Sequence, residues 1–343
     1  MKHLQSRVAA AIAAGIAFAA FAPPVYAAGE VNIYSYRQEV LIRPLLARFA
    51  QATGIKVNVV FAKKGMIARL KAEGVNSPAD VILTVDAGRL IRAKQAGVLQ
   101  PIASKALASA VPAQYRDPEG YWFGLTVRGR PIIYAADRVK PSELSTYEGL
   151  ASAKWKGRIC IRSSGNIYNQ SMLASMIAHN GVAKTEHWAK GFVANFARKP
   201  KGGDRDQIRA VAAGVCDIAL ANTYYLAGMT GSKRATDRKA ARKVRIFWPN
   251  QGGRGTHVNI SGAAVTKSSK NRANAVKLLE FLASDEAQRI YAQKVLEYPV
   301  KPGIAVAQVL EGWGKFKADR LELAELAKHN ADAVKVADRA GWR

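Results

Sequence analysis

The chain has 343 residues and a formal net charge of +27, from 52 basic and 25 acidic side chains. This length exceeds what one hydrophobic core usually organises, so two domains are expected. The charge suggests a nucleic-acid partner, but Lys and Arg are scattered, and no helix-turn-helix, zinc-finger or RNA-recognition pattern occurs. Their densest group, at 233–245, is interpreted as a solvated surface, with a specific polyanion site as the alternative. We therefore expect no nucleic-acid partner, and a basic protein near anionic membrane or envelope surfaces is the simpler interpretation.

Residues 1–27 have the organisation of a secretory signal peptide. Lys2 and Arg7 begin it, an apolar run covers 8–21, and residues 25–27 supply a small-x-small cleavage site. The run is shorter than the roughly 20 residues that span a bilayer, and no comparable run follows. We expect cleavage after this site and a soluble, periplasmic protein.

Strand and helix patterns alternate in the first part of the mature chain. Hydrophobic periodicity and boundary residues predict strands at 31–36, 55–62 and 80–85, and helices at 41–53, 66–73 and 87–96. This alternation is typical of an α/β fold with parallel strands. The aromatic and apolar segment 121–134 follows, and it is predicted to cross between domains in an extended conformation.

The second part of the chain repeats the alternation. It predicts strands at 158–162 and 215–221, and helices at 169–179, 186–197 and 206–213. The Gly-rich stretch 248–265 lacks helical periodicity and is the best candidate for a return crossing. Residues 271–342 are predicted to be mainly helical, with a break at 298–303.

Two adjacent tyrosines, Tyr224 and Tyr225, follow the strand predicted at 215–221. Asn222 and Thr223 are favoured N-cap residues, so we expect the strand to end there and a helix to begin at Leu226. In the first turn of that helix, neighbouring side chains can converge. Two phenolates suit a hard, highly charged cation such as ferric iron. An ordinary packed tyrosine pair is the alternative.

The chain has two cysteines, Cys160 and Cys216, each in a strand-like run that precedes a tyrosine, Tyr168 and Tyr224 respectively. In an exported protein such a pair can form a disulfide. Bridging needs Cα atoms within about 7 Å, which requires the two strands to be neighbours. We predict the disulfide, and two separate buried thiols are the alternative.

With both tyrosine segments in view, the chain resembles the periplasmic ferric-ion-binding proteins of bacterial iron ABC transporters. The resemblance is carried by VNIYS at 31–35, TVDAG at 84–88, GLT at 124–126, IRSSGNIYNQS at 161–171, NTYYL at 222–226, NISG at 259–262 and EYPV at 297–300. It implies the two-lobed α/β fold of type II periplasmic binding proteins, with a ligand cleft between the lobes. We assign 28–128 and 256–305 to lobe 1, and 129–255 and 306–343 to lobe 2.

The resemblance also implies a set of metal ligands. In relatives of this type, iron is bound by the tyrosine of the NIYNQS-like segment and by both tyrosines of the NTYYL-like segment. In this chain these residues are Tyr168, Tyr224 and Tyr225.

The first lobe departs from the pattern of many relatives, which carry Ser-Arg-His-Tyr after the first strand with the His and Tyr as ligands. Here Gln38 and Glu39 take those places. Glu39 is a candidate carboxylate ligand, and Tyr36 in the same loop is a second candidate. Alternatively, Glu39 is an exposed acidic residue at a helix start, and water or a small anion completes the metal shell.

A charge count shows what else the site requires. Three phenolates neutralise Fe3+, and an ionised Glu39 leaves the cluster with one negative charge. An arginine would balance that charge or hold a carbonate-like anion as an additional ligand, as in several relatives. Arg37 and Arg128 are the candidates by position, and an ordinary surface role is the alternative for each. Because a bound cation lowers the pKa of a phenol, normally about 10, iron affinity is expected to fall in acid.

The leading hypothesis is a non-enzymatic, monomeric solute-binding protein that captures ferric iron by hinge closure and delivers it to an inner-membrane ABC permease. A binder of phosphate, thiamine or a polyamine with the same fold is the alternative. An exported enzyme is a different class, and no H-E-x-x-H or G-x-S-x-G motif supports it. The histidines of the mature chain are too dispersed in the sequence to match a metal-binding motif; they are His179, His187, His257 and His329.

Overall fold

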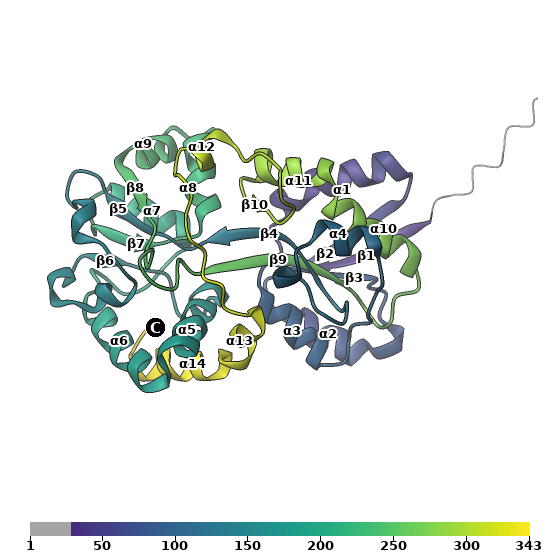
Figure 1. The fold of residues 1–343 in the computed structure, drawn as a ribbon, viewed down its shortest axis with the longest axis horizontal. Coiled ribbons are helices and arrows are strands. Elements are labelled where there is room, and N and C mark those ends of the chain that lie inside the picture. The colour runs from purple at the N-terminus through teal and green to yellow at the C-terminus, as the bar shows by residue number, and fades with distance from the viewer. Residues whose placement is uncertain (1–28) are drawn as a thin grey trace, which may run out of the picture.

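The computed structural model describes residues 29–343, so the predicted signal peptide and its cleavage site lie outside the described residues. Two lobes lie side by side along the long axis of the molecule, each built around its own sheet (Figure 1). The strands are β1 (Glu30–Ser35), β2 (Lys56–Phe61), β3 (Val81–Thr84), β4 (Phe123–Gly129), β5 (Ile132–Ala135), β6 (Ile159–Cys160), β7 (Ile218–Leu220), β8 (Val244–Phe247), β9 (Val258–Val265) and β10 (Tyr298–Pro299).

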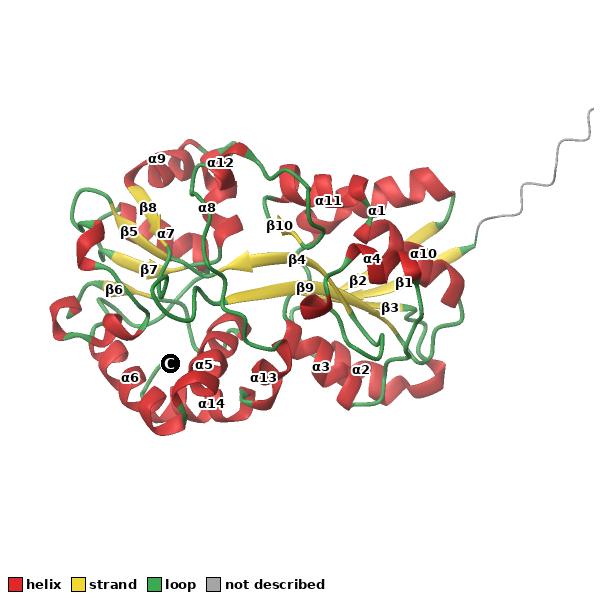
Figure 2. Ribbon diagram, viewed as in Figure 1, coloured by secondary structure: helices red, strands yellow, loops and turns green. Residues whose placement is uncertain are grey.

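The helices surround both sheets (Figure 2). They are α1 (Glu39–Thr53), α2 (Met66–Glu73), α3 (Ala87–Gln95), α4 (Lys105–Ala110), α5 (Ile167–Asn180), α6 (Val182–Ala194), α7 (Asp204–Ala212), α8 (Thr223–Thr230), α9 (Ala235–Lys243), α10 (Arg272–Ala283), α11 (Asp285–Ile290), α12 (Gln308–Glu311), α13 (Leu323–Lys328) and α14 (Asn330–Arg339). None of these helices is long and apolar enough to cross a membrane.

Lobe 1 is the lobe with six strands, in the order β10-β4-β9-β3-β1-β2, and lobe 2 has four, in the order β6-β7-β5-β8. Helix α1 shows how the sequence sets the local structure of lobe 1. Ile42, Leu45 and Phe49 recur at helical spacing and are buried against the sheet. The helix ends at Gly54, whose φ of 71° lies in the left-handed region that glycine adopts without strain, and whose N–H donates to the carbonyl of Ala50.

Two extended segments cross between the lobes, as the sequence predicted. Segment 121–134 contributes β4 to the lobe 1 sheet and most of β5 to the lobe 2 sheet, and the return segment leads from β8 in lobe 2 to β9 in lobe 1. The two crossings are neighbours, because β4 pairs with β9 and the backbone N–H of Arg130 donates to the carbonyl of His257 at 3.1 Å. This paired connection is where the lobes can hinge.

The strands of the alternating segments are parallel, as predicted, but the sheets also contain antiparallel pairs that involve the crossing segments. Strand β1 is parallel to β2 and β3, and β6 is parallel to β7, but β9 is antiparallel to β3 and β4, and β5 is antiparallel to β7 and β8. Both sheets are therefore mixed. The physical reason is the double crossing, since a strand that returns from the other lobe enters the sheet in the opposite direction.

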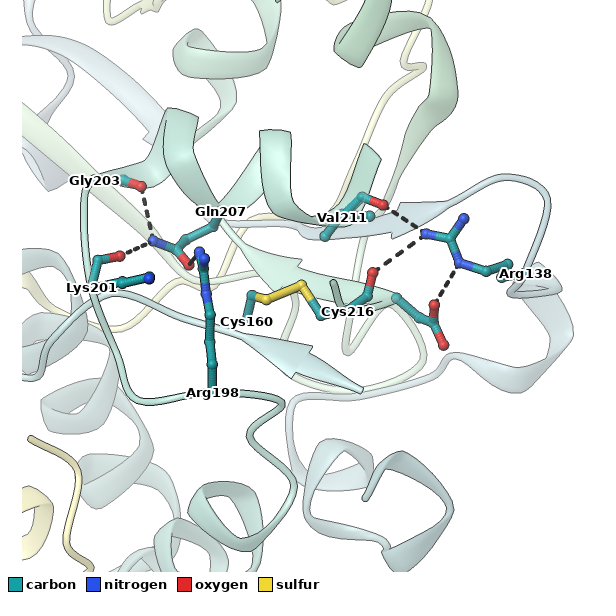
Figure 3. Close-up of a disulfide and its surroundings, with 9 residues drawn as sticks. Arg138, Cys160, Arg198, Lys201, Gly203, Gln207, Val211 and Cys216 are labelled. Carbon is teal, nitrogen blue, oxygen red and sulfur yellow. Dashed lines mark hydrogen bonds and ion pairs between the residues drawn. A yellow bond between two sulfur atoms is a disulfide. The ribbon is translucent and has the colours of Figure 1, made fainter. Parts of the chain in front are cut away.

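The predicted disulfide between Cys160 and Cys216 is present, with Cα atoms 5.8 Å apart (Figure 3). Cys160 ends β6 and Cys216 lies just before β7, its parallel neighbour in the sheet. On one side of the bridge, Arg138 donates to the carbonyls of Val211 at 2.6 Å and Cys216 at 3.4 Å. The disulfide therefore joins the two strands that lead into α5 and α8.

Candidate functional site

Three tyrosines meet at the inner side of lobe 2. Tyr168 is the second residue of α5, and Tyr224 and Tyr225 lie in the first turn of α8. All three side chains are buried. The hydroxyl of Tyr224 donates to the hydroxyl of Tyr168 at 3.1 Å, and the ring centroids of Tyr224 and Tyr225 are 4.3 Å apart. The two tyrosine segments singled out in the sequence thus form one cluster.

The starts of helices α5, α7 and α8 all lie at this cluster. Asn166 caps α5 by accepting a hydrogen bond from the N–H of Tyr168 at 3.0 Å, and the first residues of α7 line the same pocket as Tyr168 and Tyr225. Helix N-termini carry partial positive charge and unpaired N–H groups. This side of lobe 2 therefore favours negative charge, such as that of a phenolate.

Burial disfavours the phenolate forms of Tyr224 and Tyr225 when no cation is present. It is the main cause that raises the pKa of Tyr224 well above its usual 10, and the neighbouring Tyr168 and Tyr225 add to the effect, while Arg128 opposes it. Burial is likewise the main cause of the raised pKa of Tyr225. The phenolate forms consequently need a bound cation to supply the missing stabilisation.

A buried polar network fixes the helix starts that carry the tyrosines. Arg130 donates to Asp204 at 3.2 Å, to Asn222 at 2.9 Å and to Asn169 at 2.6 Å, which joins the starts of α7, α8 and α5. Helix α8 begins at Thr223, three residues before the predicted start at Leu226, and although Asn222 is its N-cap residue, the side chain of Asn222 does not cap the helix. Its oxygen accepts from Arg130 instead, because the buried guanidinium needs acceptors.

Two arginines that the sequence interpretation did not single out also face the tyrosines. The guanidinium of Arg162 lies 5.5 Å from the ring centre of Tyr168 and pairs with Asp204 at 2.9 Å, and the guanidinium of Arg205 lies 4.9 Å from the ring centre of Tyr225. Arg162 belongs to the IRSSGNIYNQS segment, so its closeness in sequence to Tyr168 could have identified it as a candidate site residue. Arg205 follows the start of α7, and nothing in its surrounding sequence marks it.

From lobe 1, Gln38 reaches the tyrosine cluster directly. Its side-chain amide donates to the hydroxyl of Tyr225 at 3.2 Å and so connects the two lobes across the cleft. The other residues proposed from this loop lie differently. Glu39 is exposed, and its carboxylate pairs with Arg43 one turn further along α1.

Tyr36 lies closer to the cluster than its neighbour Glu39 does. It lines the same pocket as Tyr168 and Tyr225, and its hydroxyl accepts a hydrogen bond of 3.1 Å from the N–H of Ile67. The guanidinium of Arg89 lies 4.3 Å from its ring centre. A hydroxyl oxygen has two lone pairs, so this hydrogen bond leaves one of them unused.

The pocket between the lobes has a volume of about 430 Å3. Lobe 1 contributes polar and cationic side chains, and lobe 2 contributes the tyrosines with further arginines. Its principal lining residues are Tyr36, Gln38, Arg89, Arg162, Tyr168, Arg205 and Tyr225. A pocket with this lining suits a ligand that carries negative charge, or a cation that arrives with anionic donors.

The two arginines predicted for an anion have different surroundings. Arg37 is buried and pairs with Glu297 at 2.7 Å, and it also donates to the hydroxyl of Ser261 at 2.6 Å. Thr126 donates to the same carboxylate at 2.5 Å. Glu297 belongs to the EYPV segment, and its role in holding Arg37 was not foreseen from the sequence.

Arg128 has no carboxylate partner within residues 29–343. It donates to the hydroxyl of Ser261 at 3.3 Å and to the carbonyl of Val85, and its guanidinium lies 5.6 Å from the ring centre of Tyr168. Its charge is therefore not neutralised by an ion pair, whereas that of Arg37 is. The sequence alone gave these two residues equivalent roles.

The remaining metal-ligating residue types do not form a site. In the described part of the chain, no group of three or more His, Cys, Asp and Glu side chains is placed to hold a metal ion. His179 pairs with Asp319 at 2.9 Å, and His257 is buried beside the crossing segments.

Two lobes on paired crossing strands, with a polar pocket between them, are the architecture expected of a protein that encloses a solute by closing its lobes. The chain belongs to the family of bacterial extracellular solute-binding proteins, whose pattern matches residues 45–318, and within it to the ferric-iron-binding proteins of ABC-type iron uptake. It is 49% identical over 315 residues to iron uptake protein A1 of Synechocystis sp., covering 92% of this chain and 88% of that protein.

Solved structures agree with this assignment. A Trichodesmium protein in complex with iron and citrate ligands shares 53% sequence identity and superposes with a TM-score of 0.86, covering 92% of this chain and all of that one. The ferric binding protein from Campylobacter jejuni shares 42% identity with a TM-score of 0.89, covering 91% of this chain and 100% of that chain. The predicted two-lobed α/β fold and the predicted non-enzymatic class are thereby confirmed.

Proposed function

We propose that this protein captures ferric iron in the cleft through the phenolate oxygens of Tyr168, Tyr224 and Tyr225 and delivers it to an inner-membrane ABC permease. The observation that carries the proposal is the convergence of three buried phenols from two helices, with two of the hydroxyls 3.1 Å apart. Relatives described as iron uptake and ferric-iron-binding proteins support the choice of cargo.

The chemistry follows from the state of the phenols. Phenolate oxygen is a hard donor, and three phenolates balance the charge of Fe3+. Because burial raises the pKa of Tyr224 and of Tyr225, their protons leave only when the cation replaces them. Binding should therefore release protons, and uptake of protons in acid should release the metal.

For the donors from lobe 1, the geometry supports Tyr36 more than Glu39. Tyr36 lines the pocket, whereas Glu39 is exposed and paired with Arg43. Gln38 contributes as the residue that connects lobe 1 to Tyr225. We propose that Tyr36 or a small anion completes the coordination once the lobes close.

For a carbonate-like anion, the geometry supports Arg128. Its charge has no carboxylate partner in the described residues, whereas Arg37 is held by Glu297. The relative from Trichodesmium holds citrate together with iron. We propose that an anion beside the iron contacts Arg128, and that Arg37 supports the loop after β1.

Capture and release require movement of the lobes about the paired crossings β4 and β9. We propose that the lobes have the bounds predicted from the sequence, 28–128 with 256–305 and 129–255 with 306–343. The family is extracellular. We propose a monomer in the periplasm, exported by the segment 1–27.

One alternative cargo has support in the pocket itself. The cationic lining residues Arg89, Arg162 and Arg205 favour an anionic solute such as phosphate. They are less suited to a cationic solute such as a polyamine. An anion binder with the same fold is therefore the second candidate function.

The visible spectrum distinguishes these candidates. Ferric citrate is added to purified apo protein, and the tyrosinate-to-iron charge-transfer band is recorded. We expect the band to grow to one equivalent of iron and to be weaker and shifted in the Tyr224→Phe variant, which keeps two of the three proposed phenolates. Tyr115→Phe, which changes a partly buried tyrosine of lobe 1, is the matched control. A colourless mixture at stoichiometric iron would favour the anion binder.

A further inference from the structure

The densest group of cations in the sequence forms one outward face in lobe 2. Six side chains of this segment are exposed, and we call them the basic face of α9; they are Lys233, Arg234, Lys239, Arg242, Lys243 and Arg245. None of the six forms an ion pair within residues 29–343, although many other cations of the chain do. The acidic residue of the same segment, Asp237, is buried and pairs with Arg209 instead.

The fold orients this face toward solvent. The inward side of α9 carries Asp237, Ala240 and Ala241, which are buried against α7 and α8. Figure 1 places α9 at the outer edge of lobe 2, away from lobe 1. The charges of the basic face therefore lie on α9 and on the residues that directly flank it, and no acidic side chain forms an ion pair with them in the described residues, so an external anion at this face would reduce their mutual repulsion.

The composition of the face indicates the class of partner. Its exposed residues other than the six cations are Ala235 and Thr236. Specific protein interfaces depend on aromatic or large apolar residues at their centre, and recognition of single-stranded nucleic acid depends on aromatic platforms; this face offers neither. An anionic lipid surface requires only a group of Lys and Arg residues.

We propose that the basic face of α9 binds the anionic phospholipid headgroups of a membrane surface. Helix α9 packs directly against α8, which carries Tyr224 and Tyr225. A membrane bound at this face would hold lobe 2, with its tyrosine cluster, next to the bilayer. The proposal rests on the exposed charges alone and does not depend on the identity of the solute in the cleft.

The test is co-sedimentation of the full mature chain with vesicles of phosphatidylglycerol and phosphatidylcholine, compared with phosphatidylcholine alone, at about 0.1 M salt. The α9 variant combines Lys233→Gln, Lys239→Gln and Lys243→Gln. The matched control combines Lys71→Gln, Lys105→Gln and Lys277→Gln, which removes the same charge from exposed lysines of lobe 1 that form no ion pair in the described residues.

We expect the wild type to bind the anionic vesicles and not the neutral ones. Each cation near an anionic surface strengthens binding by about fivefold, so the α9 variant should bind at least about tenfold more weakly. The control should change by less than about threefold, because diffuse net charge acts at long range and is screened. Thermal melts of all three proteins report whether the fold is intact.

Three results would overturn the proposal. Equal weakening in the α9 variant and the control would show that net charge alone attracts the protein. Absence of wild-type binding to the anionic vesicles would remove the lipid partner. Binding of the wild type to heparin, lost in the α9 variant, together with no vesicle binding would assign the face to a soluble polyanion instead.

Discussion

The hydroxyl of Tyr224 donates a hydrogen bond of 3.1 Å to the hydroxyl of Tyr168, although the two residues are 56 positions apart and belong to different helices. The contact requires the starts of α5 and α8 to meet, and the Arg130 network holds them there. A packed core tyrosine would be expected to direct its hydroxyl toward a backbone acceptor, as Tyr147 does toward the carbonyl of Arg130. Two hydroxyls directed at each other are a geometry that a shared cation can occupy.

The first prediction concerns these phenols. Phenylalanine keeps the ring and removes only the oxygen, so Tyr224→Phe and Tyr225→Phe should each weaken iron binding strongly while the fold persists. Tyr168→Phe should weaken it somewhat less. Loss of one charged donor should cost about 2 to 4 kcal/mol of binding free energy. Iron titration against a competing chelator measures the effect.

Melts of the apo variants provide the control for this prediction. Removal of a buried hydroxyl whose partner is another phenol should change stability by about 1 kcal/mol. Wild-type iron affinity in both the Tyr224→Phe and Tyr225→Phe variants would show that the pair is core packing, and the proposed ferric site would be wrong.

The second prediction separates the neighbouring residues Gln38 and Glu39. Gln38→Ala should weaken iron binding by a few-fold, since it removes one hydrogen bond across the cleft worth about 1 kcal/mol. Glu39→Gln should leave the affinity unchanged, because the carboxylate is exposed and pairs with Arg43. The same chelator competition measures both, and a larger loss in Glu39→Gln than in Gln38→Ala would restore Glu39 as a ligand.

The third prediction separates Arg37 from Arg128. Arg37→Gln leaves the buried carboxylate of Glu297 without its ion-pair partner, so the apo protein should lose about 3 to 5 kcal/mol of unfolding free energy. Arg128→Gln breaks no ion pair and should instead weaken iron binding and abolish its dependence on added bicarbonate. Urea unfolding and iron titration with and without bicarbonate measure the two effects, and the opposite pattern would exchange the two roles.

The local part of the site could be predicted from the sequence, and the part that depends on the approach of distant segments could not. Tyr168, Tyr224 and Tyr225 occur in short motifs next to helix starts, and each motif is a single stretch of chain. The ion pair between Arg37 and Glu297 joins residues that are 260 positions apart in the sequence. No pattern within either segment contains that information.

The same distinction applies to the fold. Helix α2 was predicted with its observed bounds, because apolar spacing and Gly74 determine it locally. The segment 233–245 was interpreted only as a charge cluster, although it forms α9 and leads into β8. Its helix is specified mainly by two buried alanines, Ala240 and Ala241, which leave a weak apolar pattern. The direction of the strands in the crossing segments was not predicted, since it depends on which lobe a crossing segment comes from.

The fourth prediction concerns the disulfide. Replacing both Cys160 and Cys216 by alanine should lower the free energy of unfolding by about 2 to 5 kcal/mol, because the bridge closes a loop between residues 56 positions apart. The β6–β7 pairing and the Arg130 network remain, so the folded variant should keep its iron stoichiometry. Urea unfolding of both proteins measures the loss, and an unchanged midpoint would show that the bridge adds no stability.

The last prediction concerns acid stability and His257, at the start of the return crossing. Burial is the main cause that lowers the pKa of His257 from 6.5 to about 3, and the charges of Arg130, Arg128 and Arg254 lower it further. The folded state therefore keeps this ring neutral while the unfolded state protonates it below pH 6.5. The unfolded state binds more protons between pH 6.5 and pH 3. The stability that the neutral ring of His257 contributes is therefore fully present above pH 6.5 and is lost as the pH falls from 6.5 to 3.

Between pH 7 and pH 5 the ring should account for about 2 kcal/mol of lost stability. His257→Gln removes the titrating group. Between pH 7 and pH 5, the unfolding free energy of this variant should therefore fall by about 2 kcal/mol less than the unfolding free energy of the wild type. His187→Gln, which changes an exposed histidine of α6, is the control and should follow the wild type. Urea unfolding at pH 7, 6 and 5 measures all three proteins, and parallel pH profiles for the wild type and His257→Gln would show that the buried ring is not what destabilises the hinge in acid.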